Sequence, residues 1–149
     1  MEVKMEIQEM TMEFDSSSSN ESFARVAVAA FAARLDPTMD EITDIKTAVS
    51  EAVTNCIIHG YEGSTGRIRV ECKIIENELF ITVIDRGCGI NDIKKAMEPL
   101  YTSKPELERS GMGFAFMEAF MDNLRVSSIP FGGTIVQMSK KIEQKSLDK

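Results

Sequence analysis

Long apolar runs are absent from the sequence, and so is tryptophan. No stretch of the 149 residues approaches the roughly 20 apolar residues that a membrane-spanning helix needs. The opening Met-Glu-Val-Lys-Met-Glu alternates charged and apolar side chains, whereas a signal peptide carries a continuous apolar block. We therefore expect a cytoplasmic protein that does not enter the membrane.

Cysteine is also scarce. The three cysteines, Cys56, Cys72 and Cys88, are odd in number and show no Cys-x-x-Cys spacing, so neither a disulfide framework nor a zinc site is indicated. Each has apolar or glycine neighbours, which is typical of a small core residue in a reducing compartment.

Positive charge is outnumbered by negative charge. The chain has 17 Lys and Arg against 24 Asp and Glu, a net charge of -7. Direct binding to nucleic acid requires a basic surface, so the composition argues against it. An acidic chain can still bind ATP, because a bound metal and local amides offset the phosphate charge. It can also bind a basic protein partner.

Three common nucleotide-binding patterns are missing as well. The sequence contains no Gly-x-x-x-x-Gly-Lys-Ser/Thr, and it lacks the motifs of protein kinases with a glycine-rich loop. The glycines of Asp85–Ile90 do not open a strand-helix-strand unit, which excludes a dinucleotide-binding fold.

What the sequence does contain is a clear succession of strands and helices. Alternating and helical spacings predict strands at about 9–14, 68–74, 79–85, 124–128 and 134–140, and helices at 20–35, 38–59, 92–97 and 111–121. Tight turns join neighbouring strands, and helices separate the hairpins. We expect one α+β domain, 1–149: a two-layer sandwich in which a mixed, mostly antiparallel sheet carries helices on one face. Residues 1–8 and 141–149 are expected to be flexible extensions, with a strand joined through a bulge as the alternative for 1–8.

Two details of the helices can be tested. Ser18 with Glu21, and Thr38 with Glu41, have the form of capping boxes. The first helix shows apolar residues at helical spacing, which predicts its core-facing side: Phe23, Val26, Ala27, Ala30 and Phe31.

Glu51 and Asn55 lie four residues apart on the second helix, off its apolar stripe. The spacing brings the two side chains together on one face. A solvated helix face explains this equally well. If the pair is functional, Asn55 would hold a divalent metal through its carbonyl oxygen and Glu51 would accept a proton from a hydroxyl group or water.

Asp85 ends a strand in the same phase as its apolar residues, so its carboxylate should point inward and need a partner. An ordinary strand-end turn would explain the following Arg-Gly-Cys-Gly-Ile equally well. In a nucleotide site, Asp85 would accept a hydrogen bond from adenine, and Gly87 and Gly89 would let the backbone pass beneath the ring. Thr134 points to the same side of its strand and either supports Asp85 or only packs there.

Ser110-Gly-Met-Gly-Phe114 opens a helix after a loop rich in proline and charge. Backbone N–H groups at a helix N-terminus favour phosphate, although Gly-x-Gly alone is a weak signal. The order of all four motifs, from about Glu9 to Met138, resembles the GHKL (Bergerat-fold) ATP-binding superfamily.

Within that superfamily the sequence is most similar to the stand-alone bacterial anti-sigma serine kinases. Gyrase-type members carry a transducer domain that needs a longer chain. Sensor histidine kinases need a phosphoacceptor histidine on a separate helix, whereas the one histidine here, His59, follows Asn55 on the same helix. The segments that carry the resemblance are Asn20–Val26, Leu35–Glu41, Ser50–Tyr61 and Thr102–Phe114.

The resemblance implies a Mg-ATP-dependent serine kinase that is also an anti-sigma factor. It would form a homodimer, hold a sporulation sigma factor of the sigma-F type inactive, and phosphorylate a serine of an anti-anti-sigma protein. Two alternatives stay open: a kinase directed at a general-stress sigma factor of the sigma-B type, and a nucleotide-gated sigma-binding module without significant catalysis. A pure binder has no use for Glu51 beside the metal, which favours a kinase.

By the same resemblance, Glu51 would be the general base and Asn55 the Mg²⁺ ligand, while Asp85 with Thr134 would contact adenine. Residues expected to shape the pocket and phosphate site are Gly87, Gly89, Ser110, Gly111 and Gly113. Residues 92–110 would form a lid over ATP, and Lys104 and Arg109 in that lid would contact the phosphates or a protein partner. Arg25, otherwise a solvated helix residue, would dock a protein partner. His59 receives no role.

Overall fold

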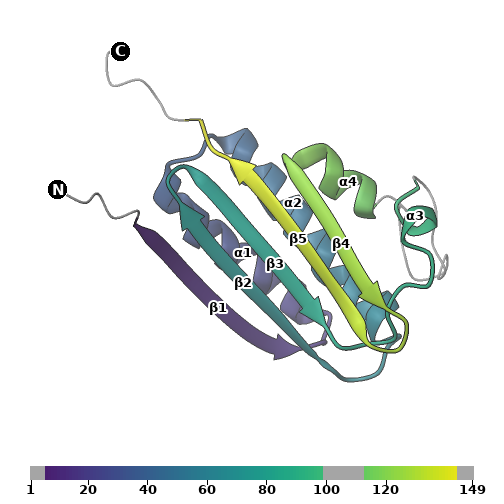
Figure 1. Ribbon diagram of the computed structural model, residues 1–149. Helices are drawn as coiled ribbons and strands as arrows, with labels where there is room; N and C mark the ends of the chain where they lie inside the picture. Colours follow the sequence, from purple (N-terminus) through teal and green to yellow (C-terminus); the bar gives the residue numbers. More distant parts are fainter. Residues whose placement is uncertain (1–5, 99–112, 144–149) are drawn as a thin grey trace, which may run out of the picture.

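A sheet of five strands forms one layer of the protein, and every neighbouring pair of strands in it is antiparallel. The computed structural model describes residues 6–98 and 113–143. The strand order is β1-β2-β3-β5-β4 (Figure 1), with β1 Ile7–Asp15, β2 Arg67–Ile75, β3 Glu78–Asp85, β4 Asn123–Ile129 and β5 Gly133–Lys141. The two predicted hairpins, β2-β3 and β4-β5, are both present.

The long helices form the second layer, behind the sheet in Figure 1. They are α1 Ser19–Ala32, α2 Met39–Asn55 and α4 Gly113–Phe120. A 3₁₀ turn, Ala33–Leu35, extends α1, and a π-helical turn, η2 Cys56–Gly60, extends α2. The short α3, Ile93–Ala96, lies near β4. The predicted α+β sandwich with helices on one face is confirmed, and no helix among the described residues has the length and apolar character to cross a membrane.

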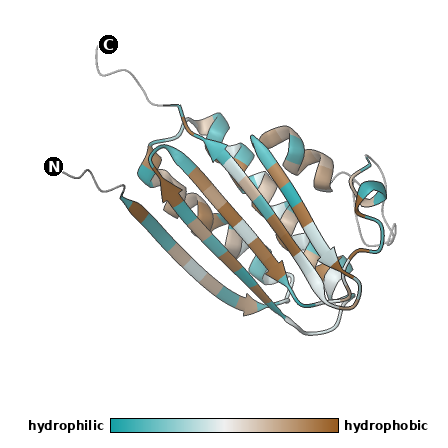
Figure 2. Ribbon diagram, in the orientation of Figure 1, coloured by the Kyte–Doolittle hydropathy of each residue, from teal (hydrophilic) through white to brown (hydrophobic). Residues whose placement is uncertain are grey.

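The core lies between the central strands and α2. β2 and β3 alternate apolar and polar residues, and Figure 2 shows the resulting apolar bands. One row across the sheet consists of Val70, Val83, Val136 and Val126, which are register partners. Burying a valine side chain contributes about 1.5–3 kcal/mol, so this row is a major source of stability. From the other layer α2 supplies its fully buried stripe: Ile45, Ala48, Val49, Ala52 and Val53.

Of the two predicted capping boxes, only the one on α2 forms. Thr38 Oγ1 accepts the Glu41 N–H at 3.1 Å, and the Glu41 carboxylate accepts the Thr38 N–H at 2.8 Å. Ser18 is helical in backbone conformation and makes no side-chain cap bond, so the first prediction is wrong. The carboxylate of Glu21 turns away instead and accepts hydrogen bonds from Arg25 and from Ser50 on α2.

The predicted core face of α1 is also wrong in part. Phe23 and Val26 are 56% and 57% exposed, whereas Ala24 and Val28 are fully buried. The buried stripe also includes Phe31 and Ala32. The α1 residues that face the core are thus smaller, on average, than the apolar residues that remain at its surface. Periodicity alone could not separate two neighbouring apolar rows on one helix.

The ends of the domain extend further than predicted. β1 begins at Ile7 with no bulge, and Ile7 is 49% exposed because it lies on the outer face of the edge strand. β5 continues to Lys141, and Ile142 beyond it is buried. The N–H of Ile142 donates to the carbonyl of Asn77 in the β2-β3 turn, and the Asn77 amide donates to the carbonyl of Ile142. These two hydrogen bonds hold residue 142 against the β2-β3 turn, where a flexible C-terminal extension was expected.

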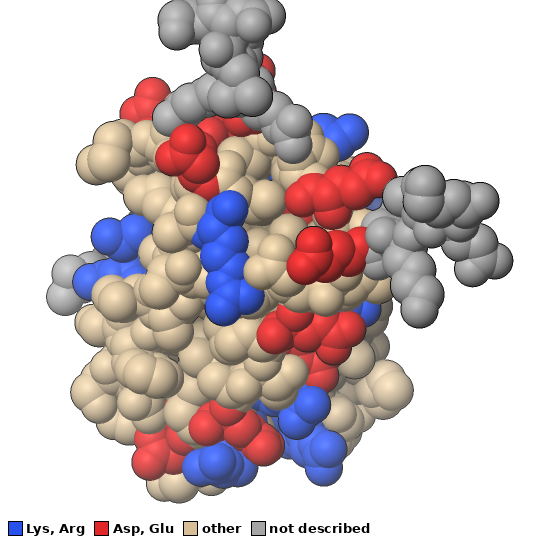
Figure 3. Space-filling view, turned by 90° about the vertical axis from the view of Figure 1, so that its left-hand side faces the viewer, with Lys and Arg blue, Asp and Glu red and all other residues tan. Residues whose placement is uncertain are grey.

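Charge is interspersed over the face of the molecule at the β1 edge. Figure 3 shows a stretch of lysine and arginine near the middle of this face, a row of acidic side chains to its right, and uncharged areas between them. Across the β1-β2 ladder Glu9 faces Lys73 and Glu13 faces Arg69. Positive charge on this face is therefore neutralised locally.

Candidate functional site

Asp85 ends β3 with its carboxyl group buried. The residue is 4% exposed, and its Oδ1 accepts a 2.9 Å hydrogen bond from the N–H of Gly87. Burial raises the pKa of Asp85 because it disfavours the charged carboxylate. Hydrogen bonds from the Gly87 N–H, the Cys56 thiol and the Thr134 N–H partly oppose that rise. The predicted inward orientation of Asp85 is confirmed, together with its need for partners.

The π-helical turn η2 places Gly60 directly against Asp85. A Cβ atom on Gly60 would lie 2.9 Å from Asp85 Cγ, closer than real Cβ atoms approach other atoms. The Gly60 carbonyl accepts the Cys88 N–H at 2.8 Å, and a Cβ on Gly87 would lie only 2.0 Å from that carbonyl oxygen. Such π-helical turns occur often at functional sites. Gly60 is not among the predicted site residues, and no local sequence signal indicates this contact.

The β4-β5 hairpin closes the other side of the glycine motif. Gly89 has φ +77°, and its Cβ would lie 2.3 Å from the carbonyl oxygen of Ile129. Phe131 donates its N–H to the Cys88 carbonyl at 2.5 Å. Glycine is therefore required at 87 and 89 for close packing of this chain on itself, whether or not a ligand is present.

Thr134 lies opposite Asp85 in the β3-β5 ladder and is 4% exposed. Its hydroxyl oxygen lies 3.2 Å from Ser128 Oγ, which also accepts the Ile90 N–H at 2.6 Å. The Thr134 hydroxyl thus belongs to a small polar network with Ser128, and its backbone N–H supports the Asp85 carboxylate. Ser128 is a residue that the sequence analysis missed, because a serine in an alternating strand is unremarkable by itself.

Tyr61 fastens the loop after η2 to the same end of the sheet. Its hydroxyl accepts the Arg86 N–H at 2.9 Å and donates to the Arg67 carbonyl at 2.5 Å. A Cβ on Gly66 would lie 2.2 Å from the Tyr61 ring. This side chain therefore holds the start of β2 beside the end of β3.

The predicted core position is confirmed for Cys56 and Cys72 but not for Cys88. Cys56 and Cys72 are buried free thiols and Cys88 is half-buried. Burial raises the pKa of all three, that of Cys72 to about 12, so none is an activated thiolate. The Cys88 thiol donates to the His59 carbonyl at 3.0 Å. Their role is packing and hydrogen bonding around Asp85 and in the core.

Glu51 and Asn55 both lie on α2, half-buried and one helical turn apart. Asn55 is the last α-helical residue, and the next residue, Cys56, contacts Asp85. The C-terminal end of α2, which carries Asn55, therefore lies at the Asp85 end of the sheet.

The remaining predicted site residues divide into three groups. Gly113 is the first residue of α4, which packs against α2. Lys104, Arg109, Ser110 and Gly111 lie outside the described residues, as does most of the predicted lid. Arg25 lies on α1, away from Asp85, with its guanidinium 2.7 Å from the carboxylate of Glu21. Arg25 is not among the residues that contact Asp85 in the described part of the chain.

Comparison with known proteins agrees with this geometry. Residues 15–140 match the model of the histidine kinase-like ATPase domain family. The chain is 62% identical over 135 residues to the anti-sigma F factor of Clostridium novyi, covering 90% of this chain and 94% of that protein. It is 59% identical over 133 residues to the anti-sigma F factor of Caldanaerobacter subterraneus subsp. tengcongensis, covering 89% and 93%. The chain therefore belongs to the histidine kinase-like ATPase domain family, the GHKL family.

Proposed function

We propose that the protein binds ATP at the Asp85 end of the sheet. The observation that carries this proposal is the buried Asp85 carboxyl, held between the π-helical turn and the glycine motif. An ionised carboxylate offers about four acceptor positions. The structure provides three donors, the Gly87 N–H, the Cys56 thiol and the Thr134 N–H. The position that remains would accept the amino group of adenine.

The residues present also fit a Mg²⁺ ion held mainly by phosphate and water. Within 6–98 and 113–143, no group of three or more His, Cys, Asp and Glu side chains could hold a metal by itself. Mg²⁺ at nucleotide sites takes few protein ligands and keeps waters and phosphate oxygens. One carboxamide oxygen, that of Asn55, would suffice. When bound, Mg²⁺ would offset negative charge on the phosphates.

Glu51 would then act as the general base. From one helical turn before Asn55, its carboxylate would accept the proton of an acceptor serine as that hydroxyl attacks the terminal phosphate; the bond from that phosphate to the bridging oxygen breaks and ADP leaves. Phosphoryl transfer depends mainly on positioning and charge stabilisation, so no covalent intermediate is needed. Backbone N–H groups near Gly113, at the start of α4, would favour the phosphates. Residues 92–110 would cover them as a lid with Lys104 and Arg109.

The names of the relatives support a proposal for the protein partners. We infer that this chain is an anti-sigma factor for a sigma factor of the sigma-F type and a serine kinase of its anti-anti-sigma antagonist. It would act in the cytoplasm as a homodimer of one-domain subunits, and Arg25 would dock a partner. The identity of about 60% over nine tenths of the chain supports this assignment over a kinase directed at a general-stress sigma factor.

One experiment tests both ATP binding and catalysis. The protein would be mixed with labelled ATP, Mg²⁺ and the anti-anti-sigma protein of the same organism, and phosphoserine would be measured by mass spectrometry. We expect transfer by the wild type and a loss of about 10²-fold or more in Glu51→Gln, as for removal of a general base. Binding of a fluorescent ATP analogue should be unchanged in that variant.

The outcomes separate the alternatives. Bound nucleotide without phosphoserine would leave a nucleotide-gated binding module. Transfer that is unchanged in Glu51→Gln would remove Glu51 from the base role. No binding of the ATP analogue by the wild type would overturn the nucleotide site itself.

A further inference from the structure

The thiol of Cys56 is buried beside Asp85, at the start of the π-helical turn η2. Cys56 is 3% exposed, and its side chain makes a hydrogen bond with the Asp85 carboxyl group. An ionised carboxylate can only accept hydrogen bonds, so the thiol is the donor in this bond. Cys56 therefore acts directly on the group that is proposed to contact adenine.

The backbone holds Cys56 in this position from both sides. Its N–H donates to carbonyl groups in the last turn of α2. Its carbonyl accepts the Tyr61 N–H at 2.9 Å, the bond across five residues that closes the π-helical turn. In the same turn, Gly60 lies so near Asp85 that an added Cβ would be 2.9 Å from Asp85 Cγ. The thiol is thus fixed against the carboxyl group by the geometry of η2.

The donors to Asp85 come from three segments of the chain. The Gly87 N–H lies 2.9 Å from Asp85 Oδ1 in the loop after β3, and the Thr134 N–H belongs to β5. The Cys56 thiol is the side-chain donor of this set and comes from η2. Burial of Asp85 favours the protonated carboxyl group, and each donor favours the carboxylate. Without the thiol, the carboxyl group would turn more freely and hold a proton more readily.

The state of the Asp85 carboxyl group determines which purine base suits the site. Adenine carries an amino donor at the ring position where guanine carries a carbonyl acceptor. A carboxylate that is held in place as an acceptor attracts the amino group and repels the carbonyl group. A carboxyl group that turns away, or that presents a proton of its own, loses part of this preference.

We propose that Cys56 is a positioning residue that keeps the Asp85 carboxylate directed at the base and so makes the site select adenine over guanine. The inference rests on the proposed ATP site and adds a specificity determinant to it. No covalent step is involved, because the thiol keeps its proton and acts on the nucleotide only through Asp85.

The test measures how ATP and GTP displace a fluorescent ATP analogue, whose own affinity is determined for each variant. Cys56→Ala removes the donor, and we expect the ATP affinity to fall about tenfold, as for loss of one hydrogen bond to a charged group. The GTP affinity should stay the same or rise. Cys56→Ser keeps a donor of similar size, so its preference for ATP over GTP should remain within about twofold of the wild-type value.

Cys72→Ala is the matched control. Cys72 is also a buried free thiol, but it lies on β2, four residues beyond Ile68, the register partner of Asp85. Its loss should lower stability, as measured by urea denaturation, and leave the preference for ATP unchanged. Cys56→Val also lacks the donor and fills the space of the thiol, so it supplies the same comparison if Cys56→Ala does not fold.

Purine riboside triphosphate, which carries hydrogen in place of the adenine amino group, separates positioning from general damage to the pocket. If Cys56 acts on that amino group through Asp85, the wild type and Cys56→Ala should bind this nucleotide about equally. Equal losses for all three nucleotides in Cys56→Ala would indicate a structural role alone and overturn the inference. Unchanged ATP and GTP affinities, or the same loss of preference in Cys56→Ser, would overturn it as well and leave the proposed function standing. A wild type that binds no ATP would instead overturn the proposed function.

Discussion

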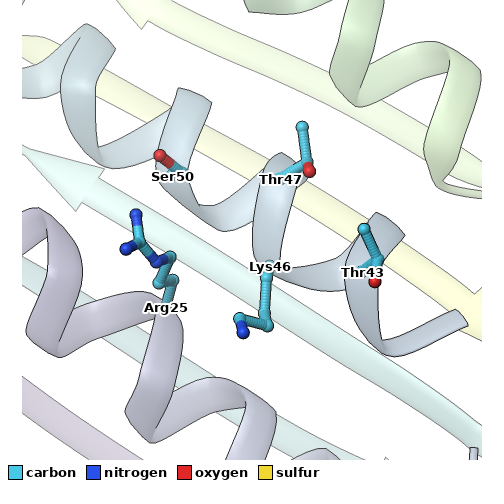
Figure 4. Close-up of a pocket in the computed structure, with 5 residues that line it drawn as sticks. All are labelled: Arg25, Thr43, Lys46, Thr47 and Ser50. Carbon is cyan, nitrogen blue, oxygen red and sulfur yellow. The ribbon is translucent and has the colours of Figure 1, made fainter. Parts of the chain in front are cut away.

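The Asp85 end of the sheet and the outer side of α1 are built in opposite ways. Around Asp85, three segments far apart in the chain meet through backbone atoms, and Gly60 and Gly87 are required because any side chain would collide. On α1, Arg25 lines a groove shared with α2 (Figure 4), and Phe23 and Val26 are each more than half exposed. A site fixed by backbone packing tolerates little change, whereas a surface made of side chains can be altered without loss of the fold.

The largest expected effect is at Gly87. In Gly87→Ala the new Cβ would lie 2.0 Å from the Gly60 carbonyl oxygen, so η2 and the glycine motif must separate. We expect the free energy of unfolding to fall by about 3 kcal/mol, the upper range for overpacking. Binding of an ATP analogue should be lost as well. Urea denaturation and fluorescence titration would measure the two effects.

Gly63→Ala is the control for that prediction. Gly63 has φ +84° with nothing within 4 Å of its added Cβ, so only backbone strain of about 1 kcal/mol is expected. Equal losses of stability in the two variants would show that packing around Asp85 is not the cause.

A second prediction compares two valines on α1. Val28 is fully buried and Val26 is 57% exposed. Val28→Ala leaves a cavity between α1 and its neighbours and should cost about 2 kcal/mol of unfolding free energy. Val26→Ala should change it by less than about 0.5 kcal/mol, as for most surface substitutions. Thermal and urea unfolding would show the difference, and a reversed order would mean that the exposed row is buried in the protein in solution.

The smallest expected effect is a change of pH dependence in Asp85→Asn. Burial raises the pKa of Asp85, so the folded protein keeps this proton to a higher pH than the unfolded chain, whose value is near 3.8. The unfolding free energy of the wild type should therefore fall as the pH rises from that value through the raised folded-state pKa. Asp85→Asn lacks the group and should lack this part of the fall. Parallel curves for the two proteins in urea would contradict the burial effect.

The sequence was most reliable where pattern and packing agree. The strands read as alternating residues, and the Thr38–Glu41 capping box predicted the start of α2, because each signal is local. The sequence predicted the core face of α1 wrongly in part. Two apolar rows lie side by side on that helix, and only packing in the folded protein determines that the row with Ala24 is buried. The prediction also failed at Ser18, because Arg25 and Ser50 compete for the Glu21 carboxylate that a capping box would need.

By itself the sequence determined the α+β class and the order of the elements, since these follow from periodicity, while the resemblance to a known family singled out Glu51, Asn55 and Asp85 as candidate site residues. Only the tertiary structure decided that Gly60, Ser128 and Tyr61 surround that site, and that Lys46 and Arg25 share a groove. Contacts between segments many residues apart depend on how the layers pack. That packing geometry cannot be predicted from the spacing of residues along the chain.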